Sequence, residues 1–180
     1  LREGEWAKSA YLGTELNGAT LGIVGLGRVG QEVAKRLDAL GMELVVHDPY
    51  INQERAAQFG AELVEDLDAC LARADVATVH TPLLPETEGM IGAAELETLG
   101  DGFLVNCARG GIVDEDALAA AVADGSLRGA AVDVFAEEPL DSDSPLLNAA
   151  EIVVTPHLGA STRAAQENVA VDTAQPILAA

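Results

Sequence analysis

The chain has 180 residues, the size of a single folded domain, and 49% of them are hydrophobic, which allows a sizeable core and excludes global disorder. It carries 30 acidic against 10 basic residues, so its formal net charge is −20 at pH 7. This charge excludes nucleic acid or an anionic membrane as the main partner, because their phosphates would be repelled.

Short apolar segments alternate with amphipathic segments along the whole chain. The apolar segments predict β-strands at Thr20–Val24, Glu43–His47, Glu62–Val64, Val76–His80, Gly102–Asn106, Ala130–Val134 and Ile152–Val154. Several of them are apolar at successive positions, which is typical of a parallel sheet with both faces covered. The alternation predicts an α/β fold: a Rossmann-type, doubly wound parallel sheet with helices on both faces and right-handed crossovers.

The first predicted strand ends in a glycine-rich turn, Gly25-Leu26-Gly27-Arg28-Val29-Gly30, which opens a helix. In this spacing Gly25 allows the tight turn, Gly27 lets a pyrophosphate approach the backbone, and Gly30 permits close packing of helix on strand. The helix N-terminus offers free N–H groups and a partial positive charge to phosphates. The turn therefore predicts a dinucleotide site.

Two helices are predicted in detail from their apolar stripes and end signals. The first has a stripe at Val29, Val33, Leu37 and Leu40, and Gly41 follows as its C-terminal stop. The second has Asp114 as N-cap, a stripe at Leu118 and Val122, and Gly125 at its end. The acidic, proline-containing segment Glu137–Pro145 is predicted to be a surface loop.

The second predicted strand ends in His47-Asp48, so a carboxylate stands 18 residues after Gly30. A dinucleotide fold places an acid near this point to bind the adenosine ribose diol. A carboxylate there repels a 2′-phosphate, and no Lys or Arg follows before Arg55, so the sequence favours NAD over NADP. The alternative is a glycine-tight strand–helix turn with an N-capping acid and no ligand.

Three polar residues follow later strands, at the carboxyl ends where open α/β sheets bind ligands. Arg109 precedes a Gly-Gly turn, where its guanidinium can grip a carboxylate; the alternative is a surface arginine paired with an acid. His157 is suited to acid–base chemistry near neutral pH, or it is a capping or packed histidine. Glu138 can hold that imidazole and favour its protonated form, or it is simply solvated.

Several motifs of the chain recur together in one known family. They are Glu15-Leu16-Asn17-Gly18, the GLGRVG turn, His47-Asp48-Pro49, Asn106-Cys107-Ala108-Arg109-Gly110-Gly111, Val132-Asp133-Val134-Phe135 with Glu137-Glu138-Pro139, and Pro156-His157-Leu158-Gly159-Ala160-Ser161-Thr162. With them the chain resembles the D-isomer-specific 2-hydroxyacid dehydrogenases, from about Leu16 to Val169. NCARGG and PHLGAST are most similar to the family members that oxidise 3-phosphoglycerate in serine biosynthesis.

The resemblance implies a role for each candidate residue. Arg109 would bind the substrate carboxylate and keto oxygen, His157 would shuttle the proton, and Glu138 would orient and tune the histidine. Asp133 would contact the nicotinamide carboxamide. The cofactor-binding residues that it implies are Gly25, Gly27, Arg28, Val29, Gly30, Asp48, Thr81, Pro82, Cys107, Asp133 and Gly159. No metal is expected.

The activity that the resemblance implies is that of an oxidoreductase: NAD-dependent oxidation or reduction of a D-2-hydroxy acid. The expected reaction is oxidation of 3-phosphoglycerate to 3-phosphohydroxypyruvate. Two alternatives stay open. One is a different substrate, such as glyoxylate, hydroxypyruvate or another D-2-hydroxy acid. The other is a non-enzymatic, NAD-sensing module similar to the dehydrogenase-like transcriptional corepressors, which keep similar residues.

Family members build a second, substrate-binding domain from segments on both sides of the nucleotide-binding domain. We therefore expect residues 1–180 to form an NAD-binding domain alone. Residues 1–14 would be its entering helix, and residues 162–180 the start of an exit helix toward a missing substrate domain. Such a domain is expected to be inactive or weakly active by itself, and the resemblance implies a homodimer.

Acids run through every segment, while lysine occurs only twice, at Lys8 and Lys35. This pattern predicts a halophilic protein, whose carboxylates hold hydration while salt screens their repulsion; the alternative is an ordinary acidic cytoplasmic protein.

Cys70 and Cys107 form no CxxC and lie among apolar residues, so both are expected to be small buried residues in a reducing cytoplasm. No apolar run approaches the ~20 residues that cross a bilayer, and no segment has a signal-peptide pattern.

Overall fold

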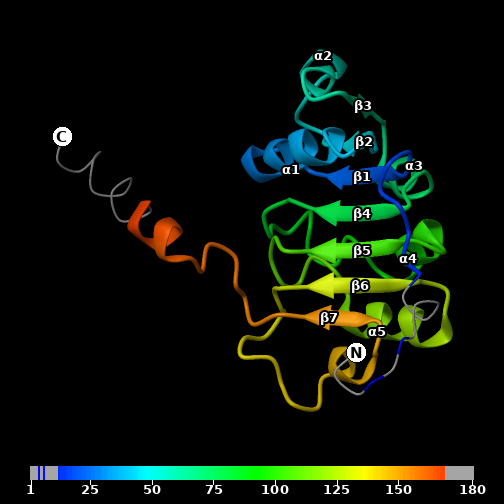
Figure 1. Cartoon of the computed structure of the whole chain (residues 1–180), viewed down its shortest axis with the longest axis vertical. Helices are drawn as coiled ribbons and strands as arrows, with labels where there is room; N and C mark the ends of the chain where they lie inside the picture. The colour runs from blue at the N-terminus through cyan, green and yellow to red at the C-terminus, as the bar shows by residue number, and fades with distance from the viewer. Residues whose placement is uncertain (1–3, 5, 7–11, 169–180) are drawn as a thin grey trace.

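A computed structural model describes residues 4, 6 and 12–168 of the chain. Seven parallel strands form one sheet in the order β3-β2-β1-β4-β5-β6-β7 (Figure 1). The strands are β1 (Thr20–Val24), β2 (Glu43–His47), β3 (Ala61–Leu63), β4 (Val76–Val79), β5 (Phe103–Asn106), β6 (Gly129–Val132) and β7 (Ile152–Val154). The helices are α1 (Arg28–Asp38), α2 (Gln53–Ala57), α3 (Leu67–Leu71), α4 (Ala93–Leu99), α5 (Glu115–Asp124) and the short 3₁₀ helix η2 (Pro145–Asn148).

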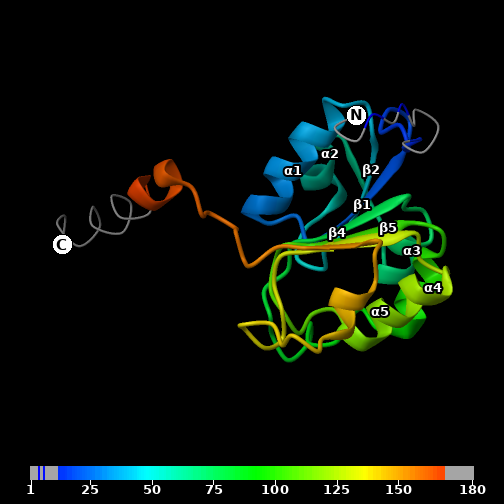
Figure 2. The same ribbon diagram turned by 60° about the horizontal axis from the view of Figure 1, so that its bottom comes forward.

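The helices form a layer on each face of the sheet. Figure 2 shows α1 and α2 on one face and α3, α4 and α5 on the other. The chain builds outward from β1 to β2 and β3, then crosses to β4 on the other side of β1 and continues to β7. The strand order therefore reverses between β1 and β4, and such a reversal opens a crevice at the carboxyl ends of the strands. The predicted doubly wound fold is confirmed.

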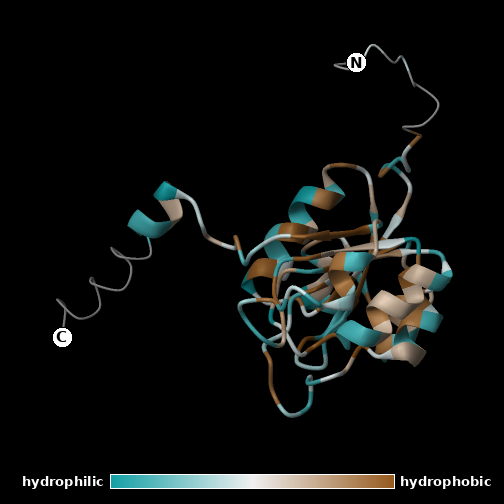
Figure 3. Cartoon of the chain, turned by 90° about the horizontal axis from the view of Figure 1, so that it is seen from below, coloured by the Kyte–Doolittle hydropathy of each residue, from teal (hydrophilic) through white to brown (hydrophobic). Residues whose placement is uncertain are grey.

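Each face of the sheet covers its own hydrophobic core. Leu21, Ile23 and Ala34 are buried in the core between the sheet and the first two helices. The larger core on the opposite face includes Leu104 and Leu118. The hydropathy colours agree, with brown strands inside and teal segments outside (Figure 3). Both faces are buried because crossover helices cover them, which explains the continuous apolar runs in the sequence.

The predicted strands match the observed ones closely. β1, β2 and β7 have the predicted bounds, and the other four begin or end within two residues of them. The predicted stripe of the first helix is wrong in part, because Val29 is 63% exposed and Leu40 is 55% exposed. The face that α1 buries is made by Gly30 and Ala34, whose small side chains allow close approach to the sheet. Leu40 lies beyond the helix, which ends at Asp38.

The second predicted helix is confirmed as α5. The Asp114 carboxylate accepts a hydrogen bond from the backbone N–H of Ala117, as an N-cap does. Leu118 and Val122 are buried, and Gly125 ends the helix in the left-handed conformation with φ of 80°. Residues 137–143 form the predicted surface loop. Pro145, which was predicted to end this loop, is the first residue of η2.

The two chain ends lie partly outside the described residues. Most of the predicted entering helix, residues 1–14, is outside them, and residues 12–14 are not helical. In the predicted exit helix, residues 163–168 are helical, and residues 169–180 lie outside the described part. The 163–168 helix stands apart from the sheet in Figure 1. Within the described ranges, no helix is long and apolar enough to cross a bilayer.

Candidate active site

The predicted site residues all follow the carboxyl ends of strands. The arrows of Figure 1 point the same way, so these ends form one edge of the sheet. Six of the seven strands contribute: the glycine turn after β1, Asp48 after β2, Thr81 and Pro82 after β4, Cys107 and Arg109 after β5, Asp133 and Glu138 after β6, and His157 and Gly159 after β7. The fold therefore brings together residues that are more than 130 positions apart in the sequence.

The glycine turn has the geometry that a dinucleotide site requires. Gly25 has φ of +94°, a conformation that L side chains rarely adopt. A Cβ on Gly30 would lie 2.2 Å from the carbonyl oxygen of Gly25, so this close packing of α1 on the turn excludes any side chain. A Cβ on Gly27 would meet no protein atom within 4 Å. Open space over Gly27 is what a pyrophosphate needs, so the turn fits the cofactor.

The N-terminus of α1 is free to bind an anion. Its N-cap is Gly27, which offers no side-chain acceptor, and its first turn contains no acid. The helix therefore carries an uncompensated partial positive charge at this end. Arg28 and Val29 are both exposed in the same turn. In a chain of net charge −20, such a local positive site is a specific place for phosphate groups.

Asp48 connects the glycine turn to the end of β2. Its Oδ2 accepts a hydrogen bond from the N–H of Leu26 at 2.8 Å, and its Oδ1 accepts one from the N–H of Tyr50 at 2.9 Å. The carboxylate thus binds the turn itself rather than capping α1. Each oxygen keeps a second lone pair, so both can still accept hydroxyl groups of a ribose. This contact with Leu26 was not predicted from the sequence.

Thr81 lies beside the same turn. A Cβ on Gly25 would lie 3.0 Å from its Cγ2, which shows how closely the loops after β1 and β4 approach. The hydroxyl of Thr87 donates to the carbonyl oxygen of Pro82 at 2.6 Å and so closes the loop that follows. Thr81 and Pro82 therefore lie after β4, next to β1, where the strand order reverses and where open α/β sheets bind ligands.

The turn that carries Arg109 is held by Asn106. The Asn106 side chain is buried; its Oδ1 accepts from the N–H of Ala108 at 3.1 Å, and its Nδ2 donates to the carbonyl oxygen of Arg109 at 3.0 Å. Next to it, a Cβ on Gly110 would lie 1.8 Å from the carbonyl oxygen of Phe135, so the turn packs directly on the loop after β6. Asn106 was named only as part of a family motif and given no role, although an Asn before a turn is a usual signal for this contact.

Arg109 itself is exposed at this edge. Among the described residues, the Lys and Arg side chains that form ion pairs with acids are Lys35, Arg36, Arg73 and Arg128. Arg109 is in none of these pairs, and within the described ranges its guanidinium donates to one acceptor, the carbonyl oxygen of Ala108. Its charge is therefore available to an anionic ligand.

His157 and Glu138 form a hydrogen-bonded pair. The Nδ1 of His157 lies 2.8 Å from the Oε2 of Glu138, while the Oε1 of Glu138 accepts from the N–H of Phe135 at 3.1 Å. The hydrogen bond from His157, with that from Phe135, holds the pKa of Glu138 below its usual value. Because Nδ1 is engaged, Nε2 is the nitrogen of His157 that remains for another partner.

Asp133 holds the loop that carries His157. It is buried, and its carboxylate accepts from the hydroxyl of Thr155 and from the N–H groups of Leu158, at 2.7 Å, and Gly159, at 2.9 Å. Burial alone would raise the pKa of Asp133, but these three hydrogen bonds outweigh it and lower the pKa. The sequence reasoning did not predict that Asp133 binds this loop.

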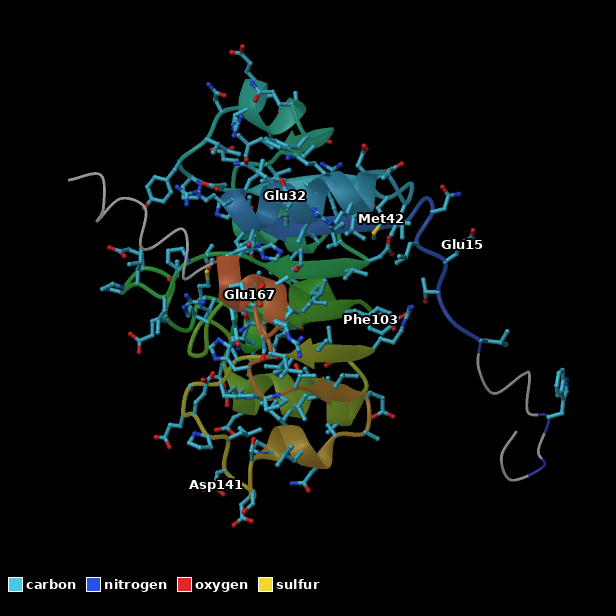
Figure 4. The ribbon with its side chains drawn as sticks, turned by 60° about the vertical axis from the view of Figure 1, so that its left-hand side comes forward. Glu15, Glu32, Met42, Phe103, Asp141 and Glu167 are labelled. Atoms are coloured by element: carbon cyan, nitrogen blue, oxygen red, sulfur yellow. The ribbon has the colours of Figure 1, made fainter. Side chains whose placement is uncertain are left out.

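A cavity of about 620 Å³ adjoins the His157–Glu138 pair. Apart from these two residues its lining is mostly apolar, with Phe135, Leu140 and Leu147 among the contributors. Asp141, labelled in Figure 4, directly follows the lining residue Leu140 in the sequence. Apolar lining on one side of the pair leaves fewer waters to compete for its hydrogen bond.

The two cysteines differ, contrary to the prediction. Cys70 is buried, and burial raises the pKa of its thiol to about 11. Cys107 is exposed, so the expectation of two buried cysteines is wrong for this one. Its place at the carboxyl end of β5 explains the exposure, since that edge of the sheet is open.

In the described part of the chain, no group of three or more His, Cys, Asp or Glu residues is arranged to hold a metal ion.

Comparison with known proteins identifies the family. The model of the D-isomer specific 2-hydroxyacid dehydrogenase, NAD binding domain, matches residues 1–159. The chain is 52% identical over 178 residues to the D-3-phosphoglycerate dehydrogenase of Mycobacterium tuberculosis, covering 98% of this chain and 33% of the relative. It is 49% identical over 179 residues to that of Archaeoglobus fulgidus, covering 99% of this chain and 34% of the relative. The chain thus spans about a third of the length of the curated relatives it matches.

Solved structures share the fold. A glyoxylate reductase from Paecilomyes thermophila matches with a TM-score of 0.84 and 36% identity, covering 94% of this chain and 51% of that one. The apo form of D-mandelate dehydrogenase from Rhodotorula graminis matches with a TM-score of 0.79 and 31% identity, covering 88% of this chain and 48% of that one.

Proposed function

Because the chain belongs to the D-isomer specific 2-hydroxyacid dehydrogenases, as their NAD-binding domain, we propose that it binds NAD and carries the catalytic residues for hydride transfer to and from a D-2-hydroxy acid. The observation that carries this proposal is the 2.8 Å contact between His157 and Glu138 at the sheet edge that also presents Arg109 and the glycine turn. These groups are a proton carrier, a carboxylate that orients it, a cation for an acidic substrate and a phosphate-binding turn.

The proposed cofactor site extends along the crevice. The pyrophosphate would lie over Gly27 at the N-terminus of α1, and Asp48 would accept hydrogen bonds from the adenosine ribose. Thr81, Pro82, Cys107 and Gly159 would line the cleft. When bound, NAD supplies the acceptor for the hydride that leaves the substrate carbon.

The proposed catalytic roles follow from the hydrogen bonds. His157 would take the hydroxyl proton of the substrate at Nε2, because Nδ1 is bound to Glu138. Glu138 would stabilise the imidazolium that forms and keep the ring oriented. Arg109 would bind the substrate carboxylate through two parallel hydrogen bonds and stabilise charge on the reacting oxygen. In the reverse direction the protonated histidine would return the proton.

For the substrate we propose 3-phosphoglycerate. The proposal is supported by identity of 46–52%, over nearly the whole chain, to curated relatives named D-3-phosphoglycerate dehydrogenase. We further propose that residues 1–180 act as one domain of a homodimeric cytoplasmic enzyme. A separate domain would then complete the substrate site and exclude water.

The test is turnover by the full-length protein that contains this domain. NADH formation is measured at 340 nm with 3-phosphoglycerate, D-lactate and D-glycerate, and NADH oxidation with glyoxylate and hydroxypyruvate. We expect 3-phosphoglycerate to have the highest kcat/KM and His157→Asn to abolish most of it. Preference for glyoxylate would replace the proposed substrate. NAD binding without turnover of any of these acids would favour a sensing module.

A further inference from the structure

The backbone of the His157 loop adopts an unusual conformation. His157 has φ of 50° and Ala160 has φ of 60°, both in the left-handed region that residues other than glycine rarely occupy. Such a conformation persists only where its surroundings hold it in place. Hydrogen bonds to Leu158 and Gly159, the residues between the two, contribute to holding it.

The side chain that makes these contacts is Asp133. It binds the N–H groups of Leu158 and Gly159 with its two oxygens, one N–H on each. Its third donor is the hydroxyl of Thr155, which shares Oδ1 with Leu158. One buried carboxylate therefore makes three of the hydrogen bonds that hold the turn presenting His157.

The sheet register places Thr155 where it can make this contact. Val132 of β6 pairs with Val154 of β7, and the N–H of Thr155 donates to the carbonyl oxygen of Val132 at 3.0 Å. Asp133 and Thr155 are thus the next residues of two paired strands, and their side chains meet just beyond the sheet. Only a side chain with a donor at this position can bind Asp133 there.

The three donors are divided unequally between the two oxygens. Oδ1 receives the hydroxyl of Thr155 and the N–H of Leu158, which use both of its lone pairs. Among the residues that the structure describes, Oδ2 receives only the N–H of Gly159, so one lone pair of Oδ2 is left. A further donor that approaches Asp133, such as an amide NH₂ group, is thereby directed to Oδ2.

We propose that Thr155 is a positioning residue for the nicotinamide end of the cofactor: its hydroxyl occupies Oδ1 of Asp133 and so leaves Oδ2 to receive the carboxamide of NAD beside the His157 turn. This inference rests on the proposed function, since it assumes that NAD binds at this edge. The hydroxyl acts through Asp133 and does not touch the cofactor. Its loss would leave a free lone pair on Oδ1, so the carboxamide would no longer be directed to Oδ2 alone; this affects the nicotinamide end and spares the adenosine end.

The test compares two ligands on the chain itself. Titration calorimetry in molar KCl measures the affinity for NAD and for ADP-ribose, which lacks the nicotinamide. Thr155→Val keeps the shape and removes the donor, Thr155→Ser keeps the donor, and Thr98→Val removes a hydroxyl on α4, far from the sheet edge. We expect Thr155→Val to weaken NAD binding about tenfold, the effect of one misplaced hydrogen bond of the carboxamide, and ADP-ribose binding less than twofold. Thr155→Ser and Thr98→Val should bind both ligands like the wild type.

Equal weakening of both ligands by Thr155→Val, or no weakening of either, would contradict the proposed role. Thermal unfolding of each variant shows whether it is folded. If Thr155→Val does not fold, Thr155→Ala replaces it, and the same selective weakening of NAD relative to ADP-ribose is expected. A wild-type chain that binds ADP-ribose and NAD equally would overturn this inference and leave the cofactor site standing. A folded wild type that binds neither would contradict the proposed function as well.

Discussion

Nδ1 of His157 lies 2.8 Å from Oε2 of Glu138, although the two side chains belong to loops that follow different strands. Their meeting depends on the pairing of β6 with β7, which brings the two loops to the same edge. The contact lowers the pKa of Glu138 and engages one nitrogen of the histidine. It is the feature of the site that most directly indicates proton transfer.

The Glu138–His157 contact predicts how Glu138 titrates. Because hydrogen bonds from His157 and Phe135 lower its pKa, the ionised form persists at neutral pH and is lost only as the pH falls through a value below 4.5. Replacing His157 with Phe removes the larger of these effects, so the pKa of Glu138 should rise toward 4.5. Carbon-13 NMR of the carboxyl group measures this. Glu137→Gln is the matched control, and an unchanged titration of Glu138 in His157→Phe would contradict the contact.

The free guanidinium of Arg109 predicts a specific kinetic defect. If the proposed enzyme binds its substrate carboxylate through Arg109, Arg109→Lys keeps the charge but loses two parallel hydrogen bonds, so KM should rise by about tenfold or more. Arg36→Lys is the control, because Arg36 pairs with Glu32 on the exposed face of α1. Steady-state kinetics with 3-phosphoglycerate distinguish the two variants. A KM equal to that of the wild type in Arg109→Lys would rule out carboxylate binding by this residue.

The buried carboxylate of Asp133 predicts a pH-dependent contribution to stability. Its lowered pKa means that it stabilises the folded state above its ordinary pKa of 3.8 and that this contribution disappears as the pH falls through the lower folded-state value. Asp133→Asn should therefore lower the free energy of unfolding by about 1–3 kcal/mol at pH 7 and by less in acid. Urea unfolding at several pH values measures the difference. The exposed Asp143→Asn should have little effect, and a pH-independent loss in Asp133→Asn would refute the assignment.

The acidic surface predicts that salt stabilises the fold. Of the 30 acidic residues, those that form ion pairs with Lys or Arg in the described part are Glu32, Glu62 and Asp101. The acidic side chains of Glu15 and Asp141 extend outward at the edge of the molecule in Figure 4. Because salt screens their mutual repulsion, the midpoint of thermal unfolding should rise steadily from about 0.1 M to about 3 M KCl. Equal stability across the series would exclude the halophilic interpretation.

The sequence predicted the strands well for a physical reason. Strands covered on both faces are continuous apolar runs, so β1, β2 and β7 could be delimited without a structure. The buried face of the first helix was predicted less well, because apolar spacing does not show which turns of a helix pack on the sheet and which extend beyond it. Val29 is exposed for this reason, while the small residues Gly30 and Ala34 make the packed face.

The site was predictable in its chemistry but not in its contacts. His157, Glu138 and Arg109 were named from motifs and from the family resemblance, and the fold places them at one edge. The hydrogen bonds of Asp133 to Thr155 and to Gly159 span 22 and 26 positions and depend on the register of β6 with β7. No local pattern encodes that register, so these contacts required the structure.

The central claim is that the glycine turn and Asp48 form a working NAD site, and calorimetry tests it most directly. NAD and NADP are each titrated into the chain in molar KCl, with Asp48→Ala and the distant surface variant Asp143→Ala alongside. We expect the wild type to prefer NAD and Asp143→Ala to keep this preference. Asp48→Ala should lose it, because the carboxylate that binds the ribose and repels a 2′-phosphate is gone. A folded wild type that binds NADP as well as NAD, or neither of them, would contradict the account.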